Sequence, residues 1–153
     1  MEREQIRTYV NEYCKLRDAQ FAVYELYARR HGLTAKELFV LDIIWFSPEG
    51  CLQSDICQRL SATKQTISAI IKKFLKRGYL SLTESEDDRR NKIIRLTDAG
   101  IQYTAQIIPP AAEAEIDAMR ALPEGEMAEL VRITTLFSNH MKRKFQEIGG
   151  TQL

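Results

Sequence analysis

Residues 63 to 77, TKQTISAIIKKFLKR, decide the fold that we expect for this chain. Their apolar side chains recur at the i, i+3, i+4, i+7 and i+8 spacing that lines one side of an α-helix. These side chains are Ile67, Ile70, Ile71, Phe74 and Leu75. At about 100° per residue the opposite side is polar and basic, with small hydrogen-bonding residues first and lysines after them. The stretch predicts a recognition helix that places its first turns in a DNA major groove and its flank against phosphates.

The residues around this helix predict a helix-turn-helix followed by a wing. Upstream, SDICQRL (54–60) has the spacing of a short helix, and Ser61-Ala62 leaves only a tight turn before Thr63, the expected N-cap. Downstream, Gly78 follows a basic run, as is common at helix ends. Two strands with a charged tip between them come next: YLSLTES (79–85), the tip EDDRRN (86–91) and KIIRLT (92–97).

The run DDRRNKIIRLTDAG (87–100) resembles the wing signature of the MarR (multiple antibiotic resistance regulator) family of transcription factors. The family pattern is Asp, any residue and Arg, then an apolar strand that ends in Leu-Thr, with a Gly three residues later. It falls here on Asp88, Arg90, Leu96, Thr97 and Gly100. The likeness spans nearly the whole chain, as a long N-terminal helix, a winged helix and two further helices.

The expected fold is mainly α with a small β-hairpin wing: a winged helix-turn-helix flanked by N- and C-terminal dimerisation helices. We expect residues 1–33 to form the N-terminal dimerisation helix, 34–97 the DNA-binding lobe and 98–153 the C-terminal dimerisation helices. Cys51-Leu52 is expected to add a short strand beside the wing. Many relatives place a Ser or Thr cap where this chain has Leu52, and since Leu cannot cap, we expect the next helix to start a residue or two later.

Caps and prolines predict the other helix boundaries. Gly32 is a C-cap signal for the first helix, and Thr34 with Glu37 forms the pattern of a capping box. Pro109-Pro110 is expected to interrupt a helix, and Pro123 to lie in the first turn of the last one. The expected helices cover residues 2–30, 35–46, 98–108, 111–122 and 124–148.

The charge of the chain is distributed unevenly. Although the net charge is only +1, residues 59–97 carry ten basic and four acidic side chains, and the remainder carries 12 basic and 17 acidic ones. A basic lobe of this kind is expected to face phosphate. No stretch approaches the roughly 20 apolar residues of a membrane span, and the N-terminus has no apolar signal region. We therefore expect a cytoplasmic protein with double-stranded DNA as its partner and no membrane contact.

The sequence lacks the motifs of an enzyme. Its two histidines, His31 and His140, stand outside any metal-ligand spacing, and neither a Gly-rich loop after a strand nor a GxSxG motif occurs. Asp87-Asp88 lie on the wing tip, a solvated place poorly suited to acid–base catalysis. The cysteines Cys14, Cys51 and Cys57 form no CxxC pair, so neither a disulfide framework nor a zinc site is indicated. We expect a non-enzymatic protein with no cofactor and no metal.

The recognition helix supplies the first set of expected DNA contacts. Gln65, Thr66 and Ser68 are expected to read bases, because a Gln amide can bond adenine in bidentate fashion and hydroxyls serve either type of base. The lysines are expected mainly at phosphates, with guanine as an alternative for the first of them. The set is completed by Thr63, Lys64, Lys72, Lys73 and Lys76.

The wing supplies the second set. The family resemblance implies that Arg90 enters the minor groove, with Arg89 as the alternative and with Asp88 holding an arginine in place. Asn91 and Lys92 complete the wing contacts. Solvation without any DNA contact is the plain alternative for each of these charges.

The family resemblance also implies a homodimer on a pseudo-palindromic operator and a small aromatic or anionic effector. Repression is the expected direction of control, and the residues identify neither the operator nor the effector. The effector would lie between the dimerisation helices and the winged helix, and for each candidate ordinary core packing is the alternative. The candidates are Tyr13, Arg17, Tyr24, Trp45 and Phe46.

Three other functions stay open at the level of sequence. Cys14 lies near the place where the peroxide-sensing branch of the MarR family carries a reactive cysteine, although that branch surrounds it with apolar residues rather than with Lys15 and Arg17. A winged helix can also serve as a protein-interaction module without specific DNA binding. Finally, a basic lobe can bind DNA as a nonspecific architectural protein.

Overall fold

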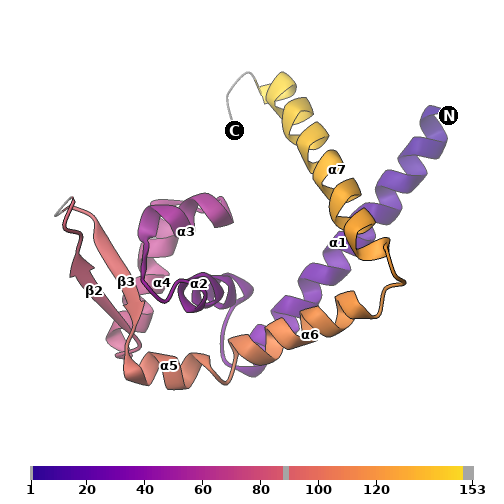
Figure 1. Cartoon of the computed structure of the whole chain (residues 1–153). Coiled ribbons are helices and arrows are strands. Elements are labelled where there is room, and N and C mark those ends of the chain that lie inside the picture. Colours follow the sequence, from indigo (N-terminus) through magenta and orange to yellow (C-terminus); the bar gives the residue numbers. More distant parts are fainter. Residues whose placement is uncertain (1, 88–89, 150–153) are drawn as a thin grey trace. The chain divides into compact units, whose positions relative to one another are not determined.

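The computed structural model describes residues 2–87 and 90–149 of the 153-residue chain (Figure 1). In chain order the elements are α1 (Arg3–Arg30), α2 (Ala35–Trp45), β1 (Cys51–Leu52), α3 (Gln53–Leu60), α4 (Lys64–Lys76), β2 (Leu80–Glu84), β3 (Lys92–Leu96), α5 (Asp98–Thr104), α6 (Ile108–Arg120) and α7 (Glu126–Gly149). The chain divides into two compact units, Met1–Pro109 and Pro110–Leu153. The predicted fold class, mainly α with a small wing, is confirmed.

The three strands form one antiparallel sheet in the order β1-β3-β2. Ile94 of the central strand pairs with Cys51 on one side and with Leu82 on the other. The turn before β1 needs glycine, because Gly50 has a φ of +95° and a Cβ there would meet the side chain of Ile93. The predicted short strand beside the wing is confirmed, and it attaches the start of α3 to the wing.

The core of the first unit lies around α2, which buries several side chains rather than a single stripe. Leu38, Val40, Leu41, Ile43 and Ile44 are all at most 5% exposed. The other elements contribute Ile56, Ile67, Ile70, Ile71, Phe74, Leu80, Ile94, Ile107 and Ile108 to the same cluster. Because α4 and the sheet share this core, the recognition helix and the wing are fixed to one packed body.

The predicted helix caps are present. Thr34 accepts a hydrogen bond from the Glu37 N–H at 3.2 Å while the Glu37 carboxylate accepts the Thr34 N–H at 3.0 Å, which completes the capping box of α2. Thr63 caps α4 by accepting the Thr66 N–H at 3.2 Å. Ser61 takes a left-handed conformation with a φ of 47°, which ends α3 and allows the tight turn into α4.

The start of α3 differs from the prediction. The helix begins at Gln53, directly after Leu52, so the expected later start was wrong. Leu52 has no side-chain acceptor, but the Asp55 carboxylate accepts a hydrogen bond from the Leu52 N–H at 3.0 Å. This contact is half of a capping box, and it is enough to satisfy one N–H group at the helix start.

The two prolines after α5 do not interrupt a helix. The preceding helix already stops at Thr104, and Pro109-Pro110 lie in the first turn of α6, which starts at Ile108, so the predicted interruption was wrong. The first N–H groups of a helix have no partner within it, and prolines are therefore tolerated there. The break is held by Tyr27, whose hydroxyl donates to the Ile107 carbonyl at 2.7 Å and whose pKa is raised by burial.

The start of α7 also differs from the prediction. Pro123 was expected in its first turn, but the helix begins at Glu126. Gly125 has a φ of +88°, which is incompatible with a right-handed helix, and the Glu126 N–H closes a turn by donating to the Pro123 carbonyl at 3.0 Å. The proline therefore belongs to the turn before the helix.

Helices α1 and α7 expose much apolar surface. The structure describes every residue of both helices. Ala28 is the only buried residue of α1, and no residue of α7 is buried. The exposed apolar residues of α1 are Ile6, Tyr9, Val10, Tyr13, Leu16, Phe21, Val23 and Leu26, and those of α7 are Met127, Leu130, Val131, Ile133, Leu136, Phe145 and Ile148.

Candidate nucleic-acid interface

The two sides of the recognition helix α4 have opposite characters. Its apolar side is buried in the core, and its polar side is open to solvent. Lys64, Gln65, Thr66, Lys72 and Lys76 are exposed, and Ser68 is half-buried. The Thr66 hydroxyl lies 2.9 Å from the Thr63 hydroxyl and shares a hydrogen bond with it, so part of its bonding capacity serves the cap. Gln65 is exposed on this polar side, and its role as a base reader stays a prediction.

The wing is joined to the end of α4 through the residues of the family signature. The Thr97 hydroxyl donates to the Gly78 carbonyl at 2.6 Å, and the Thr97 N–H donates to the Tyr79 carbonyl at 3.0 Å. The same hydroxyl accepts the Gly100 N–H at 3.0 Å and so caps α5. A Cβ on Gly100 would collide with the Tyr79 backbone carbonyl. Thr97 and Gly100 are thus needed to seat the wing beside the recognition helix.

The wing tip carries several predicted DNA contacts. Arg90, Asn91 and Lys92 are exposed, and the tip is closed by the Ser85 N–H, which donates to the Asn91 carbonyl at 3.0 Å. Asp88 and Arg89, both predicted as contacts, lie outside the described residues. The wing presents its cations from a hydrogen-bonded hairpin.

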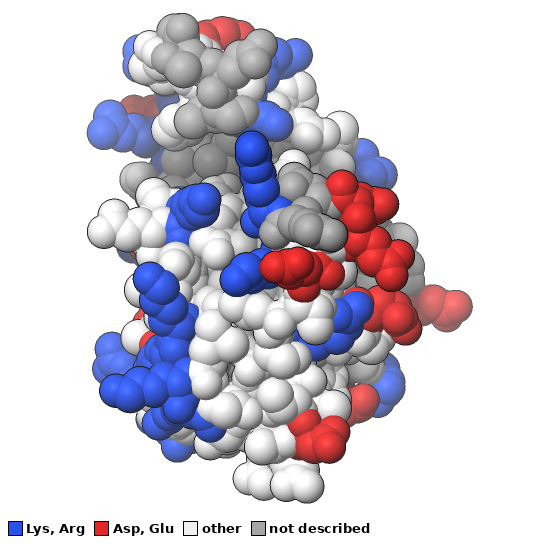
Figure 2. All heavy atoms as spheres, turned by 90° about the vertical axis from the view of Figure 1, so that its left-hand side faces the viewer, with Lys and Arg blue, Asp and Glu red and all other residues white. Residues whose placement is uncertain are grey.

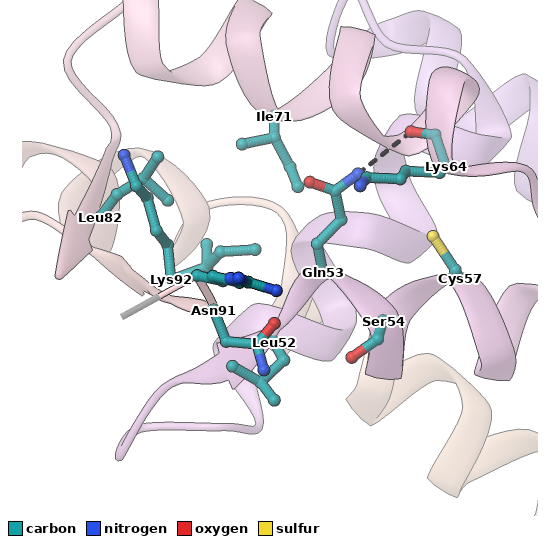
Figure 3. A pocket seen from close by; sticks show the side chains of 11 residues that line it. Leu52, Gln53, Ser54, Cys57, Lys64, Ile71, Leu82, Asn91 and Lys92 are labelled. Carbon is teal, nitrogen blue, oxygen red and sulfur yellow. Dashed lines mark hydrogen bonds between the residues drawn. The ribbon is translucent and has the colours of Figure 1, made fainter. Parts of the chain in front are cut away.

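A groove of about 460 Å³ lies between the wing, the recognition helix and the start of α3 (Figure 3). Its lining is Leu52, Gln53, Ser54, Cys57, Lys64, Ile71, Leu82, Arg90, Asn91, Lys92 and Ile94. Three of these are cations, contributed by α4 and by the wing. The groove therefore combines an apolar floor with positive charge.

Two polar residues of the groove were not among the predicted contacts. Gln53 donates from Nε2 to the Lys64 carbonyl at 3.0 Å, which ties the start of α3 to the first turn of α4 (Figure 3). Ser54 lies beside it on the same groove wall. Neither residue is charged, so composition did not mark them as DNA contacts. Only their position at the start of the helix that precedes the recognition helix could have indicated that they line this groove.

The face on the side of the wing carries both signs of charge. Figure 2 shows many Lys and Arg side chains along its left edge and near its centre, and Asp and Glu side chains mainly along its right edge, with some of each sign among the other. Basic side chains gathered in this way attract a polyanion.

Lys73 differs from the other lysines of α4. Its Nζ donates to Oε1 of Glu37 at 2.6 Å, and that carboxylate belongs to the capping box of α2. The Glu37 side chain is only 11% exposed. The lysine predicted at a phosphate therefore has an internal partner in the free protein.

The five predicted effector residues lie in varied surroundings. Tyr24 packs edge-on against Phe39 at 5.2 Å between ring centroids, and Trp45 is half-buried against the core. Tyr13 and Phe46 are exposed, and Arg17 bonds Asp18, which raises its pKa. None of the five, all of which are described, lines the groove beside the wing. Their role as an effector site stays a prediction.

The cysteines lie in three different settings. Cys51 is buried, and burial raises the pKa of its thiol, whereas Cys57 is half-buried in the groove wall and Cys14 is half-buried in α1. Across residues 2–87 and 90–149, no group of three or more His, Cys, Asp or Glu side chains is arranged to hold a metal ion. Within the same residues, no helix combines the length and apolarity of a membrane span.

Known proteins resemble this chain in sequence and in fold. The model of the MarR family matches residues 31–91. The HTH-type transcriptional regulator PapX of Escherichia coli is 33% identical over 78 residues, which are 50% of this chain and 48% of PapX. The uncharacterized HTH-type transcriptional regulator YkoM of Bacillus subtilis is 27% identical over 104 residues, covering 68% of this chain and 67% of YkoM. The chain spans about half the length of PapX and of the similar PrsX proteins.

The fold comparison extends beyond the winged helix. The crystal structure of AbsC, a MarR family transcriptional regulator from Streptomyces coelicolor, superposes with a TM-score of 0.77 at 17% identity, over 93% of this chain and 97% of AbsC. These relatives are named as transcriptional regulators, in agreement with the prediction of a non-enzymatic protein. Residues 31–91 match the model of the MarR family, and the sequence relatives, the fold and the Thr97–Gly100 anchor of the wing agree with that match.

Proposed function

We propose that this chain is a cytoplasmic, sequence-specific DNA-binding transcriptional regulator that acts as a homodimer and represses its target. The observation that carries the proposal is the groove in which cations of the recognition helix and of the wing lie together. Lys64, Arg90 and Lys92 line it from two elements that share one core. Two basic elements held at a fixed distance suit the major groove and the adjacent backbone of a duplex.

The proposed DNA contacts fall into two classes. Gln65, Thr66 and Ser68 face bases, with the Gln amide as the main discriminator between base pairs. Phosphates are met by Lys64, Lys72 and Lys76 on α4 and by Lys92 on the wing, while Arg90 enters the minor groove. Gln53 and Ser54 lie next to these cations and extend the phosphate-facing surface.

The homodimer is proposed on the apolar surfaces of the outer helices. Contiguous apolar side chains exposed on a single chain favour association, because their burial is worth about 25 cal/mol per Å². We assign dimerisation to residues 1–33 and 98–153 and DNA binding to residues 34–97. An effector held near Tyr13, Arg17, Tyr24, Trp45 or Phe46 would act by changing the spacing of the two recognition helices.

In vitro selection of bound DNA sequences tests the proposal. We expect an inverted repeat whose half-sites are separated by about one helical turn, roughly 10 bp. A gel shift against bulk DNA at several salt concentrations should accompany it, because phosphate contacts give a linear dependence of log affinity on log salt. Binding without enriched sequences would favour an architectural protein, and absence of DNA binding would favour a protein-interaction module.

A further inference from the structure

Glu37 connects two parts of the winged-helix lobe through its two carboxylate oxygens. Oε2 accepts the Thr34 N–H at 3.0 Å, and Oε1 accepts a hydrogen bond from Lys73 Nζ at 2.6 Å. The Glu37 side chain is 11% exposed, and that of Lys73 is 41% exposed. A carboxylate that is nearly buried needs such partners, because an unpaired charge in this environment is costly.

The chain before Glu37 leads directly to the end of α1. Thr34 follows Leu33, which is 3% exposed and whose N–H donates to the Ala28 carbonyl at 2.9 Å. Ala28 is fully buried. The end of α1, the capping box of α2 and the middle of α4 are therefore linked by consecutive hydrogen bonds and one ion pair.

We propose that Glu37 and Lys73 are positioning residues, which hold the recognition helix at a fixed place relative to the end of α1. This inference rests on the proposed function, in which α1 contributes to the dimer and α4 reads DNA. In a dimer the distance between the two recognition helices depends on how each α4 is held relative to α1. Operator sites require that distance to match about one turn of the duplex, roughly 34 Å. The pair thus contributes to specificity without touching a base.

Lys72 distinguishes this role from a phosphate contact. It is the neighbouring lysine on α4 and is exposed, and its side chain makes no hydrogen bond or ion pair with any of the described residues. Removal of a lysine that neutralises a phosphate lowers affinity for all DNA sequences and reduces the salt slope by about one. Removal of a positioning lysine lowers affinity only for DNA that requires the correct spacing of the two recognition helices.

The test compares Lys73→Met, Glu37→Gln and Lys72→Met in the full-length protein, with the selected inverted repeat and bulk DNA as probes. For Lys73→Met and Glu37→Gln we expect the ratio of specific to bulk affinity to fall about tenfold, comparable to one mismatched base pair, with bulk affinity and salt slope unchanged. Lys72→Met should weaken both probes and reduce the slope by about one. Lys73→Arg retains the charge and the donors, and it should restore the native ratio.

Three outcomes would overturn the inference. If Lys73→Met weakens bulk binding and lowers the salt slope as Lys72→Met does, Lys73 is a phosphate contact, and the proposed function stands without the positioning role. If both variants lower the melting temperature but keep the native ratio of affinities, the pair is only structural. If the native protein selects no sequence, the proposed function fails and the positioning role fails with it.

Discussion

Helices α4 and α7 are both amphipathic, yet only α4 has its apolar side covered. Ile67 and Phe74 of α4 are fully buried in the lobe core. Leu130 and Ile133 of α7 are 48% and 51% exposed. The lobe therefore supplies every partner that the apolar side of α4 needs, whereas the apolar side of α7 is left exposed. The comparison teaches that the lobe core is complete within one chain, while the outer helices expose the apolar surface that the proposed dimer would bury.

The largest expected effect comes from a charge on the apolar side of α7. Leu130→Glu should prevent dimerisation, because an unpaired carboxylate cannot be buried in an apolar interface. Affinity for the selected operator should fall about 1,000-fold, because a monomer no longer holds a second recognition helix near the second half-site and so loses the gain from bivalent binding. Light scattering coupled to gel filtration and a gel shift measure the two effects.

Asn139→Glu is the matched control for this variant. At about 100° per residue, nine residues place Asn139 on the side of α7 opposite Leu130. It should remain dimeric and bind the operator as the native protein does. A Leu130→Glu protein that is dimeric with native affinity would show that this side of α7 is not the interface.

A second prediction concerns the seat of the wing beside α4. Gly100→Ala places a Cβ against the Tyr79 backbone carbonyl, which cannot move without shifting the wing. We expect a loss of about 3 kcal/mol in the free energy of unfolding, as for overpacking of a rigid site. Denaturant unfolding measures it. Gly149→Ala in α7 is the control, because nothing lies within 4 Å of its Cβ, and an unchanged stability of Gly100→Ala would contradict the proposed anchor.

A third prediction addresses the exposed side of α4. Gln65→Ala should cost about 1 to 3 kcal/mol for the preferred sequence, because a bidentate amide contact to adenine is lost. Affinity for bulk DNA should hardly change. Competition of the selected operator against single-base variants locates the affected position, and full retention of selectivity would exclude Gln65 as a base reader.

Much of the lobe could be predicted because its signals are local. The apolar spacing of α4 and the caps Thr34 and Thr63 each act within a few residues, and the structure confirms them. The starts of α3 and α7 were wrong although they depend on local features, the Asp55 carboxylate and the positive φ of Gly125. The break before α6, in contrast, is decided by a contact between distant residues. Tyr27 holds the break before α6 through the Ile107 carbonyl, a contact between residues far apart in sequence.

The candidate site shows the same division between local and distant information. The exposed side of α4 follows from helical periodicity, so Gln65 and Lys72 were placed correctly on it. The pairing of Lys73 with Glu37 could not be predicted, because it depends on the packing of α2 against α4. For the same reason the groove walls contributed by Gln53 and Ser54 were missed.

The smallest expected effect tests the start of α4. Thr63→Ala removes the side chain that accepts the Thr66 N–H, and a lost N-cap costs about 1 kcal/mol of unfolding free energy. Thr63→Ser keeps the acceptor and should stay near the native stability. Thr135→Ala in α7 is the matched control, because the Thr135 hydroxyl donates to the Val131 carbonyl within the helix and caps nothing.

The cap should also matter for DNA recognition. Fraying of the first turn moves Gln65 and Thr66, so Thr63→Ala should lower operator affinity more than bulk affinity, whereas Thr135→Ala should change neither. Urea unfolding gives the stability, and a gel shift with both probes gives the ratio. Equal losses for Thr63→Ala and Thr135→Ala would mean that the first turn of α4 is held by its packing rather than by its cap.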